Sequence, residues 1–462
     1  MLTKNRNLEE LKKILPSKNV LTGREERYAY AHDATNTRRS KQLPDAVVFP
    51  ETIEEVQTIV RYANKNRIPL VCRGAGTNLV GACWCDYGGI VVCFSKMNKI
   101  VNVNRIDMTA TVQPGVVVGD LQSVVEDMGL YFPPDPSNLR VSTIGGAIAQ
   151  STGGAKTFKY GGIKDYILDL KVVLSDGSLV QTGSNTIKNA SGYNLGQLFV
   201  GSEGTLGIVV EALVKLIPKP EETQVLMGYF DSIKDATLAV NNILQNRFMP
   251  ATLDFMDGTA IKTVEQFFNI GLNTDKEAML IIEIEGFACS MEYQRESIIK
   301  ILNSSGASGV KYSRTPEEAK KIWQGRRAAF AAAAKLKPDV QTDDVIVPRS
   351  NLCTLVKGIK NICFKYDLPV SIVGHVGDGN VHPQIALNLD DEDEVKRYRL
   401  AKDEIYKLAV SLGGLISAEH GIGSEKKAFL PKTINGLSFE YMKRIKRTFD
   451  PKGILNPGKI FD

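Results

Sequence analysis

The spacing of apolar residues in the first half of the chain indicates alternating strands and helices. Residues 44–50 are a short apolar run typical of a buried strand, and residues 68–72 are another. Between them, Thr52 is suited to cap a helix whose apolar residues keep helical spacing. This stretch predicts a βαβ unit. Residues 101–118 alternate as strands do, and residues 120–128 return to helical spacing.

Two prolines close together mark the clearest domain boundary in the chain. They lie within residues 216–222, and proline disfavours both helix and sheet. Beyond them, strand patterns at residues 227–230 and 280–285 alternate with helical patterns at residues 233–246 and 290–303. The second half therefore predicts an α+β domain with an antiparallel sheet.

The bulk composition narrows the class of protein. A chain of 462 residues is too long for one ordinary core, and 43% hydrophobic with 24% charged residues is typical of soluble globular proteins. The formal charge of +5 is spread in short clusters, which disfavours nucleic acid as a partner. The chain has no apolar run long enough to span a bilayer, and its start is too charged for a signal peptide. We expect a cytoplasmic protein without an integral membrane segment.

The cysteines raise the question of a metal or iron–sulfur centre, because four of the seven fall within residues 72–93. They lack CxxC spacing, and Cys83 and Cys85 are too close in sequence to be a good pair of zinc ligands. Cys72 and Cys93 have the apolar neighbours of buried strands. We therefore expect reduced thiols, which are usual in the cytoplasm.

Glycine, or proline in the case of residues 133–139, is concentrated beside small polar residues in four segments of the first half. Glycine lets backbone N–H groups approach a phosphate, and it adopts the positive φ that such a loop requires. The first segment follows a predicted strand, but Leu79 stands where a Rossmann fingerprint needs its third glycine. One such loop is a weak signal, whereas four are harder to explain as turns. The segments are residues 73–81, 133–139, 143–154 and 201–208.

Together these segments resemble the FAD-binding domain of the vanillyl-alcohol oxidase type, the PCMH-type flavoproteins. Residues 375–382 and 417–423 resemble the C-terminal domain of the FAD-linked D-2-hydroxy-acid dehydrogenases. That family includes D-lactate dehydrogenase, the glycolate oxidase flavin subunit and D-2-hydroxyglutarate dehydrogenase. The resemblance covers about residues 40–460 in order.

The resemblance implies an α+β fold in four parts. Residues 1–43 form an N-terminal helical segment, with one apolar face made by Leu8, Leu11, Ile14 and Leu15. The other parts are a PCMH-type FAD-binding domain at 44–218, a substrate or cap domain with an antiparallel sheet at 219–415, and a C-terminal segment returning to the flavin at 416–462.

The resemblance also assigns FAD contacts position by position. The pyrophosphate would be wrapped by Arg73, Gly74, Ala75, Gly76, Thr77, Asn78 and Gly81. The flavin and ribityl chain would be lined by Pro134, Asp135, Ser137, Thr143, Gly146, Ser151 and Gly153. The adenine end would be held by Glu203, Gly204, Gly207 and Ile208, and the isoalloxazine approached by Asn380 and Asn456.

Some relatives tether FAD covalently, through a His in the first loop or a Cys in a later one. Here the loop offers Thr77 and Asn78, and the sequence between Cys93 and Cys289 contains no cysteine. The resemblance therefore implies non-covalent FAD.

Three of the four histidines in the chain fall within 46 residues. His375 and His382 flank a glycine-rich stretch, which favours a strand–turn–strand with both imidazoles at the bend. The alternative to a functional site is that both are core histidines with hydrogen-bonded ring nitrogens, on either side of an Asp-Gly turn. With Glu419 they make a His₂-carboxylate set that suits Zn²⁺ or Fe²⁺, with Mn²⁺ as a further candidate. The family places a divalent metal at the corresponding residues.

The catalytic roles follow from this set and from the resemblance. A 2-hydroxy acid could chelate the metal through its hydroxyl and carboxylate, which lowers the hydroxyl pKa. His420 would accept that proton, as the corresponding His of the family does, while the C2 hydrogen leaves as hydride to flavin N5. Asn380 would help to orient the flavin or the substrate.

The substrate carboxylate needs a cationic partner, and Arg326 aligns with the carboxylate-binding Arg of the family; Arg327 is expected at the surface. D-2-hydroxyglutarate enzymes carry a Thr and a Lys downstream for the distal carboxylate. This sequence has Phe330 and residues 342–344, Thr-Asp-Asp, in those places. An apolar and acidic environment disfavours a dicarboxylate, so we expect a small monocarboxylate such as D-lactate or glycolate.

The expected function is FAD- and metal-dependent oxidation of D-lactate to pyruvate. Two alternatives are the flavin subunit of a glycolate oxidase complex and a non-catalytic flavin subunit that relays electrons. Because the chain lacks a CxxC-type iron–sulfur motif, reduced flavin needs a partner, for which we expect an electron-transfer flavoprotein or an iron–sulfur subunit.

Overall fold

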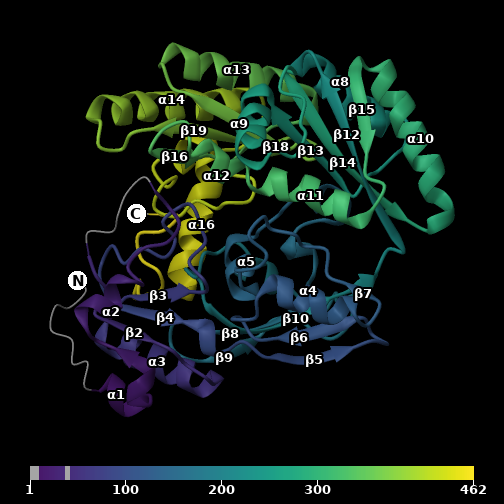
Figure 1. Cartoon of the computed structure of the whole chain (residues 1–462). Coiled ribbons are helices and arrows are strands. Elements are labelled where there is room, and N and C mark those ends of the chain that lie inside the picture. Colours follow the sequence, from purple (N-terminus) through teal and green to yellow (C-terminus); the bar gives the residue numbers. More distant parts are fainter. Residues whose placement is uncertain (1–9, 37–41, 462) are drawn as a thin grey trace. The chain divides into compact units, whose positions relative to one another are not determined.

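The chain divides into two compact units, each assembled from separate stretches of sequence (Figure 1). The computed structural model describes residues 10–36 and 42–461, so the predicted helical contact of Leu8 lies outside the described residues. Unit 1 consists of Met1–Gly153, Gly162–Lys219 and Glu419–Asp462. Unit 2 consists of Gly154–Gly161 and Pro220–Ala418. The C-terminal segment thus folds with the glycine-rich segments.

The first sheet of unit 1 contains the predicted βαβ unit. Strands β2 (Ala46–Val48) and β3 (Leu70–Arg73) both run parallel to β4 (Ile90–Cys93), and β1 (Val20–Leu21) pairs with β2. Helix α3 (Ile53–Asn66) connects β2 to β3. It begins at the expected cap, because Thr52 Oγ1 accepts a hydrogen bond from Glu55 N at 3.2 Å.

The second sheet of unit 1 is antiparallel and has the strand order β5-β6-β10-β8-β9. These strands are β5 (Ile100–Asn104), β6 (Thr109–Val112), β8 (Ile167–Val173), β9 (Leu179–Gln181) and β10 (Ile208–Lys215). A small pair is formed by β7 (Leu130–Tyr131) and β11 (Ile217–Pro218). The other helices of the unit are α1 (Leu11–Ile14), α2 (Arg24–Tyr28), α4 (Val118–Glu126), α5 (Ile144–Gln150), α7 (Gly196–Phe199), α15 (Leu430–Thr433) and α16 (Gly436–Phe449).

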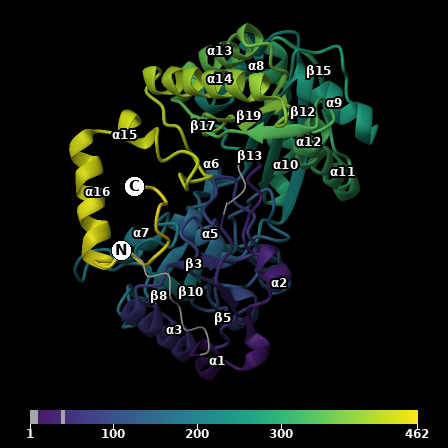
Figure 2. The ribbon, with the colours of Figure 1, turned by 90° about the vertical axis from the view of Figure 1, so that its left-hand side faces the viewer.

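The C-terminal segment is tied into unit 1 by polar contacts and by a strand-like bridge. Leu455 bridges Leu70 beside β3. Lys446 on α16, yellow in Figure 2, donates hydrogen bonds to Thr205 O at 2.7 Å and Leu455 O at 2.9 Å. These contacts fix the residues that follow the Glu419-His420 motif.

Unit 2 is built on one antiparallel sheet, as the alternating patterns predicted. Its order is β15-β12-β14-β13-β18-β19-β16, with β17 also pairing β19. The strands are β12 (Glu222–Phe230), β13 (Thr252–Asp257), β14 (Ala278–Gly286), β15 (Ala307–Tyr312), β16 (Asp339–Thr342), β17 (Val345–Ile346), β18 (Val370–His375) and β19 (Asn380–Leu387).

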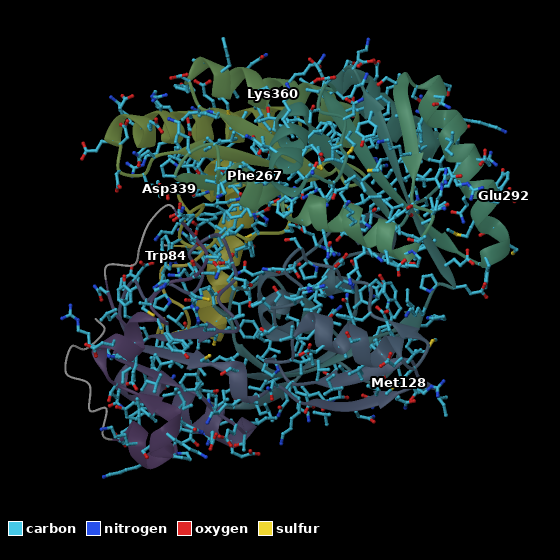
Figure 3. The ribbon with its side chains drawn as sticks, in the orientation of Figure 1. Trp84, Met128, Phe267, Glu292, Asp339 and Lys360 are labelled. Carbon is cyan, nitrogen blue, oxygen red and sulfur yellow. The ribbon has the colours of Figure 1, made fainter. Side chains whose placement is uncertain are left out.

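Helices lie along the sheet of unit 2 (Figure 1). Helices α9 (Gly258–Phe268), α11 (Pro316–Arg327) and α12 (Ala329–Ala333) pack on the face that carries Met256, Ile281 and Val373. The other helices are α8 (Ile233–Gln245), α10 (Ala288–Ser304), α13 (Leu352–Lys365) and α14 (Glu392–Ser411). Lys360 on α13, labelled in Figure 3, lies 3.2 Å from Asp257 Oδ2 at the end of β13.

Residues 154–161 come from within the first half of the chain but fold with unit 2. They include α6 (Thr157–Tyr160). Lys156 Nζ lies 3.0 Å from Glu283 Oε1, and Lys159 Nζ lies 2.8 Å from Glu285 Oε1. The two glutamates are two positions apart on β14 and therefore project from the same face. Across the described residues, the model contains no helix with the length and apolar character needed to cross a membrane.

Candidate functional site

The four glycine-rich segments of unit 1 meet around one cleft. It encloses about 1260 Å³, including its part open to solvent. Thirteen of the residues expected to contact FAD line it: Arg73, Gly74, Ala75, Gly76, Thr77, Asn78, Ser137, Thr143, Gly146, Glu203, Gly204, Gly207 and Ile208. Most of the predicted FAD-binding positions therefore share one cleft.

The first loop keeps its shape because two of its positions accept only glycine. Gly76 has φ +72°, and a Cβ there would lie 2.2 Å from Arg73 Nη2. A Cβ on Gly74 would lie 2.2 Å from Thr143 Oγ1. A side chain at either position would clash with these neighbouring side chains, and at Gly76 it would also strain the backbone. The bare backbone is what a phosphate-binding loop presents.

Residues 32–35, which lie between α2 and β2, support this loop and the residues just after it. Gly81 N donates to Thr35 Oγ1 at 2.7 Å, and Cys83 N donates to Asp33 Oδ2 at 3.0 Å. Arg73 Nη1 donates to His32 O at 2.6 Å. The loop is thus held by residues some forty positions earlier, which sequence patterns did not connect to it.

Two buried polar atoms test whether the cleft fits FAD. Gln150 Oε1 and Thr152 Oγ1 line the cleft and have no hydrogen-bond partner among the described residues. Buried polar groups are normally paired, so both atoms point to a ligand with polar groups of its own. A flavin with a ribityl chain satisfies this, while the glycine loops suit its pyrophosphate. Sequence reasoning did not single out Gln150, although it lies in the glycine-rich segment 143–154, because its residue type alone does not show that its side chain faces the cleft.

Seven other residues expected to contact FAD lie outside the lining. In unit 1 they are Gly81, Pro134, Asp135, Ser151, Gly153 and Asn456, and in unit 2 Asn380. Asn456 Nδ2 donates to Ala82 O at 3.0 Å and to Glu203 O at 2.7 Å. Its amide therefore joins two cleft-forming loops to the C-terminal segment.

Glu203 holds the C-terminal motif against the cleft. Its buried carboxylate accepts hydrogen bonds from Ile422 N at 2.7 Å and Gly423 N at 2.8 Å. Burial raises the pKa of Glu203, although these two N–H donors oppose the shift. Glu419 and His420 consequently line the same cleft as the glycine segments. A potential base and a carboxylate thus stand on the wall of the cofactor site.

The histidine pair of unit 2 lies on the predicted strand–turn–strand. Strand β18 ends at His375. His382 is on β19, where it lies opposite Val373 of β18. The imidazole centroids are 5.2 Å apart, and a ring nitrogen of each lies within 4.8 Å of one of the other. Because zinc binds imidazole nitrogen at about 2.0–2.1 Å, a pair at this spacing could hold one ion with modest adjustment.

Arg326 is paired with a buried aspartate that sequence reasoning did not single out. Its Nη2 donates to Asp254 Oδ1 at 3.1 Å, and its Nε lies 2.9 Å from Asp254 Oδ2. The same Oδ1 lies 3.7 Å from His375 Nδ1. Burial is the largest single effect on Asp254 and opposes its ionisation, but Arg326 and His375 together outweigh it and lower the pKa of that carboxyl. The expected carboxylate-binding Arg and an expected metal ligand thus share one carboxylate.

Asp344 occupies the corresponding place beside the second histidine. Its Oδ1 lies 3.9 Å from His382 Nδ1 and accepts a hydrogen bond from Asn380 Nδ2 at 2.8 Å. Its Oδ2 accepts from Ser417 Oγ and Ala418 N, both at 2.8 Å. Asn380 therefore anchors this aspartate, and the aspartate anchors the residue that directly precedes Glu419.

Comparisons with known proteins agree with this architecture. The chain matches the family model described as FAD linked oxidases, C-terminal domain, over residues 219–460, and that of an FAD binding domain over residues 44–183. It is 41% identical to the glycolate oxidase subunit GlcD of Bacillus subtilis over 461 residues, 100% of this chain and 97% of the relative. It is 33% identical to D-lactate dehydrogenase of Anaerostipes hadrus, over 98% of this chain and 96% of the relative.

A solved structure supports the fold. The structure of p-cresol methylhydroxylase with substrate bound superposes on this chain with a TM-score of 0.84 at 17% identity. The match covers 98% of this chain and 96% of the p-cresol methylhydroxylase chain. The likeness confirms the α+β architecture of the vanillyl-alcohol oxidase type that the glycine-rich segments indicated.

Proposed function

The chain belongs to the FAD-linked oxidase family, in the group of glycolate oxidase subunits and D-lactate dehydrogenases, and we propose that it oxidises D-lactate to pyruvate. The observation that carries the proposal is that His420 and Glu419 line the same cleft as the FAD-binding glycine loops. A base beside a flavin site is what removal of an alcohol's two hydrogens requires.

The proton and the electron pair leave the substrate by different routes. We assign His420 as the base that takes the hydroxyl proton, because it stands on the wall of the cofactor cleft. FAD held in the cleft would supply a two-electron acceptor for the C2 hydrogen, which leaves the substrate as hydride. The product is then the 2-oxo acid. Gln150 and Thr152 would hold the cofactor through their buried oxygens.

His375, His382 and Glu419 are our candidates to hold a divalent metal. The two histidines lie together in unit 2, and Ala418 N is fixed there by Asp344. Glu419 is the next residue of the chain, with its Cα about 3.8 Å from that of Ala418. A bound ion of this type supplies a Lewis acid that lowers the pKa of a coordinated hydroxyl.

We assign Arg326 to the substrate carboxylate, and residues further along the chain, at the positions where D-2-hydroxyglutarate enzymes bind the distal carboxylate, favour a small substrate. Phe330 follows one turn later on an apolar helix, α12. Asp343 and Asp344 are buried, and Lys402 lies 3.9 Å from Asp343 Oδ1. Two buried carboxylates would repel a second carboxylate on the substrate. D-Lactate and glycolate therefore fit better than a dicarboxylic hydroxy acid.

Steady-state rates with D-lactate, glycolate and D-2-hydroxyglutarate test the proposal, using an artificial electron acceptor. We expect D-lactate to give the highest kcat/KM and the dicarboxylate the lowest. The His420→Asn variant should lose activity by roughly 10²-fold or more while retaining FAD. Loss of FAD together with activity would indicate a structural role for His420.

The second candidate is the flavin subunit of a glycolate oxidase complex. It is favoured by the 41% identity to a subunit of that name along the whole chain. Either function requires a protein that removes electrons from the flavin, for which we propose an electron-transfer flavoprotein or an iron–sulfur subunit. A higher kcat/KM for glycolate than for D-lactate would select this candidate.

A further inference from the structure

We propose that Asp254 is a positioning residue that serves both the carboxylate-binding arginine and the metal-binding histidine. It aligns Arg326 for the substrate carboxylate, and it faces Nδ1 of His375 so that Nε2 is the nitrogen left for the metal. The inference rests on the proposed function, because that function assigns roles to Arg326 and His375.

The sheet register places Asp254 between the two residues. Asp254 on β13 is directly opposite His375 on β18. Opposed residues of adjacent antiparallel strands project from the same face, so their side chains meet. Helix α11 lies on that face and brings Arg326 to the other side of the carboxylate. Asp254 is 1% exposed, so its charge is balanced by these neighbours rather than by water.

The position of the carboxylate selects one ring nitrogen of His375. Asp254 Oδ1 lies 3.7 Å from Nδ1, which is within ion-pair range but longer than a hydrogen bond. A carboxylate on this side favours the proton on Nδ1, and the lone pair then remains on Nε2. Ligand histidines commonly carry such a carboxylate, which orients the ring and makes it a better ligand. Asp344 lies in the same relation to His382, at 3.9 Å from its Nδ1.

The same carboxylate fixes which edge of Arg326 is presented to a substrate. Arg326 Nη2 donates to Asp254 Oδ1 and Nε lies 2.9 Å from Oδ2, so Nη1 is the terminal nitrogen outside these two contacts. Helix α11 is anchored a second time one turn earlier, where Trp323 Nε1 donates to Glu283 Oε2 at 2.7 Å. Two buried anchors on one helix leave the guanidinium little freedom. Without Asp254, the second anchor would keep the helix in place but not the guanidinium.

The test compares Asp254→Asn with Asp257→Asn. Asp257 is a second buried aspartate on β13; it accepts hydrogen bonds from Ala260 N and Ile372 N and lies 3.2 Å from Lys360 Nζ. It supports the fold without contacting Arg326 or His375, so it is a matched control. Its loss should lower the melting temperature without changing the readouts below. The FAD content of each variant reports whether unit 1 is intact.

The first readout is the state of the histidine ring, which does not depend on activity. The chain has four histidines, so selective ¹⁵N labelling gives an assignable spectrum. We expect His375 to carry its proton on Nδ1 in the metal-free wild type. In Asp254→Asn that signal should shift, while the other histidine signals and the Asp257→Asn spectrum stay unchanged.

The second readout is the affinity for Zn²⁺, measured by competition with a chelator. Zn²⁺ is suitable because an N/O site binds it more tightly than Mn²⁺ or Fe²⁺. Loss of a carboxylate that orients a ligand histidine typically weakens metal binding by roughly 10–100-fold. We expect this loss in Asp254→Asn, together with an increase in KM for D-lactate, and neither in Asp257→Asn.

The outcomes separate this inference from the proposed function. Equal Zn²⁺ affinity, KM and His375 signals in the two variants would overturn the role of Asp254. A wild type that binds no Zn²⁺ and does not oxidise a hydroxy acid would overturn the proposed function, whereas the His375 spectrum would still report on Asp254. If Asp254→Asn fails to fold, Asp254→Glu provides the same readouts, because it keeps the charge but displaces the carboxylate.

Discussion

The carboxylate of Glu203 accepts a hydrogen bond from Gly423 N at 2.8 Å, across 220 positions of sequence. This contact joins the last glycine-rich segment to the backbone just beyond Glu419 and His420. It places the proposed base on the wall of the cofactor cleft, within a single compact unit. Cofactor binding and positioning of the base therefore depend on the same buried side chain.

Replacing Glu203 by Ala should destabilise unit 1 and impair turnover. The change leaves the buried N–H groups of Ile422 and Gly423 without their acceptor, which costs about 1–3 kcal/mol. Glu211→Ala is the control, because Glu211 is half-buried and pairs with the exposed Lys171 at 2.8 Å, worth about 0–1 kcal/mol. Thermal unfolding of both variants measures the difference. Equal melting temperatures would mean that the Glu203 contact does not hold the C-terminal segment.

The same residue predicts a pH dependence of stability. Burial raises the folded-state pKa of Glu203 above 4.5, despite the opposing N–H donors. A carboxyl whose pKa is raised on folding contributes most below its unfolded pKa, and this contribution is lost as the pH rises through the folded value. The melting-temperature advantage of wild type over Glu203→Gln should therefore be largest in acid and shrink toward neutral pH. An advantage that grows toward neutral pH would contradict this assignment.

Substituting Gly76 by Ala should weaken FAD binding by roughly tenfold or more. The residue has φ +72°, and its new Cβ would lie 2.2 Å from Arg73 Nη2, so strain of about 1–3 kcal/mol is expected in the loop. Gly129→Ala is a matched control, since Gly129 has φ +76° but nothing within 4 Å of a Cβ. FAD affinity is measured by recovery of flavin fluorescence on release. An equal loss of FAD affinity in both variants would mean that general backbone strain, and not the shape of the first loop, causes the loss.

The buried cysteines should resist alkylation in the native protein. Burial raises the pKa values of Cys83, Cys85 and Cys363 to about 12, so at pH 8 only roughly one thiol in ten thousand is ionised. Cys289 is exposed and should react first. Mass spectrometry of briefly alkylated protein, with a denatured sample for comparison, reads this order. Early labelling of Cys85 would show that the apolar cluster in which it packs, with Val47, Val71 and Val91, opens readily.

Much of the local structure could be predicted because its signals are local. The Thr52 cap, the helix after it and the histidine strand–turn–strand each depend on residues a few positions apart. The glycine segments identified the cleft because its loops need bare backbone, as Gly76 shows.

The features that could not be predicted from the sequence depend on contacts between residues far apart in the chain. Asp254 and Arg326 are 72 positions apart, and the aspartate stands in an apolar strand where its spacing suggests nothing. Asn456 and Asn380, which we expect at the flavin, also donate through their amide nitrogens to Ala82 O and Glu203 O, and to Asp344 Oδ1 and Val345 O, contacts that their residue type does not reveal. Tertiary pairing decides which polar residues face a ligand and which hold the fold, and residue type alone does not reveal it.

Anaerobic mixing of the FAD-loaded protein with D-lactate tests whether the substrate reduces the bound flavin and whether this requires a metal. The visible absorbance of oxidised flavin is followed in protein as purified, in protein treated with a chelator, and after Zn²⁺ or Mn²⁺ is restored. The account predicts rapid bleaching, its slowing by roughly 10²-fold or more after chelation with FAD still bound, and recovery with the metal. A flavin that stays oxidised with D-lactate and glycolate, with metal present, would contradict it.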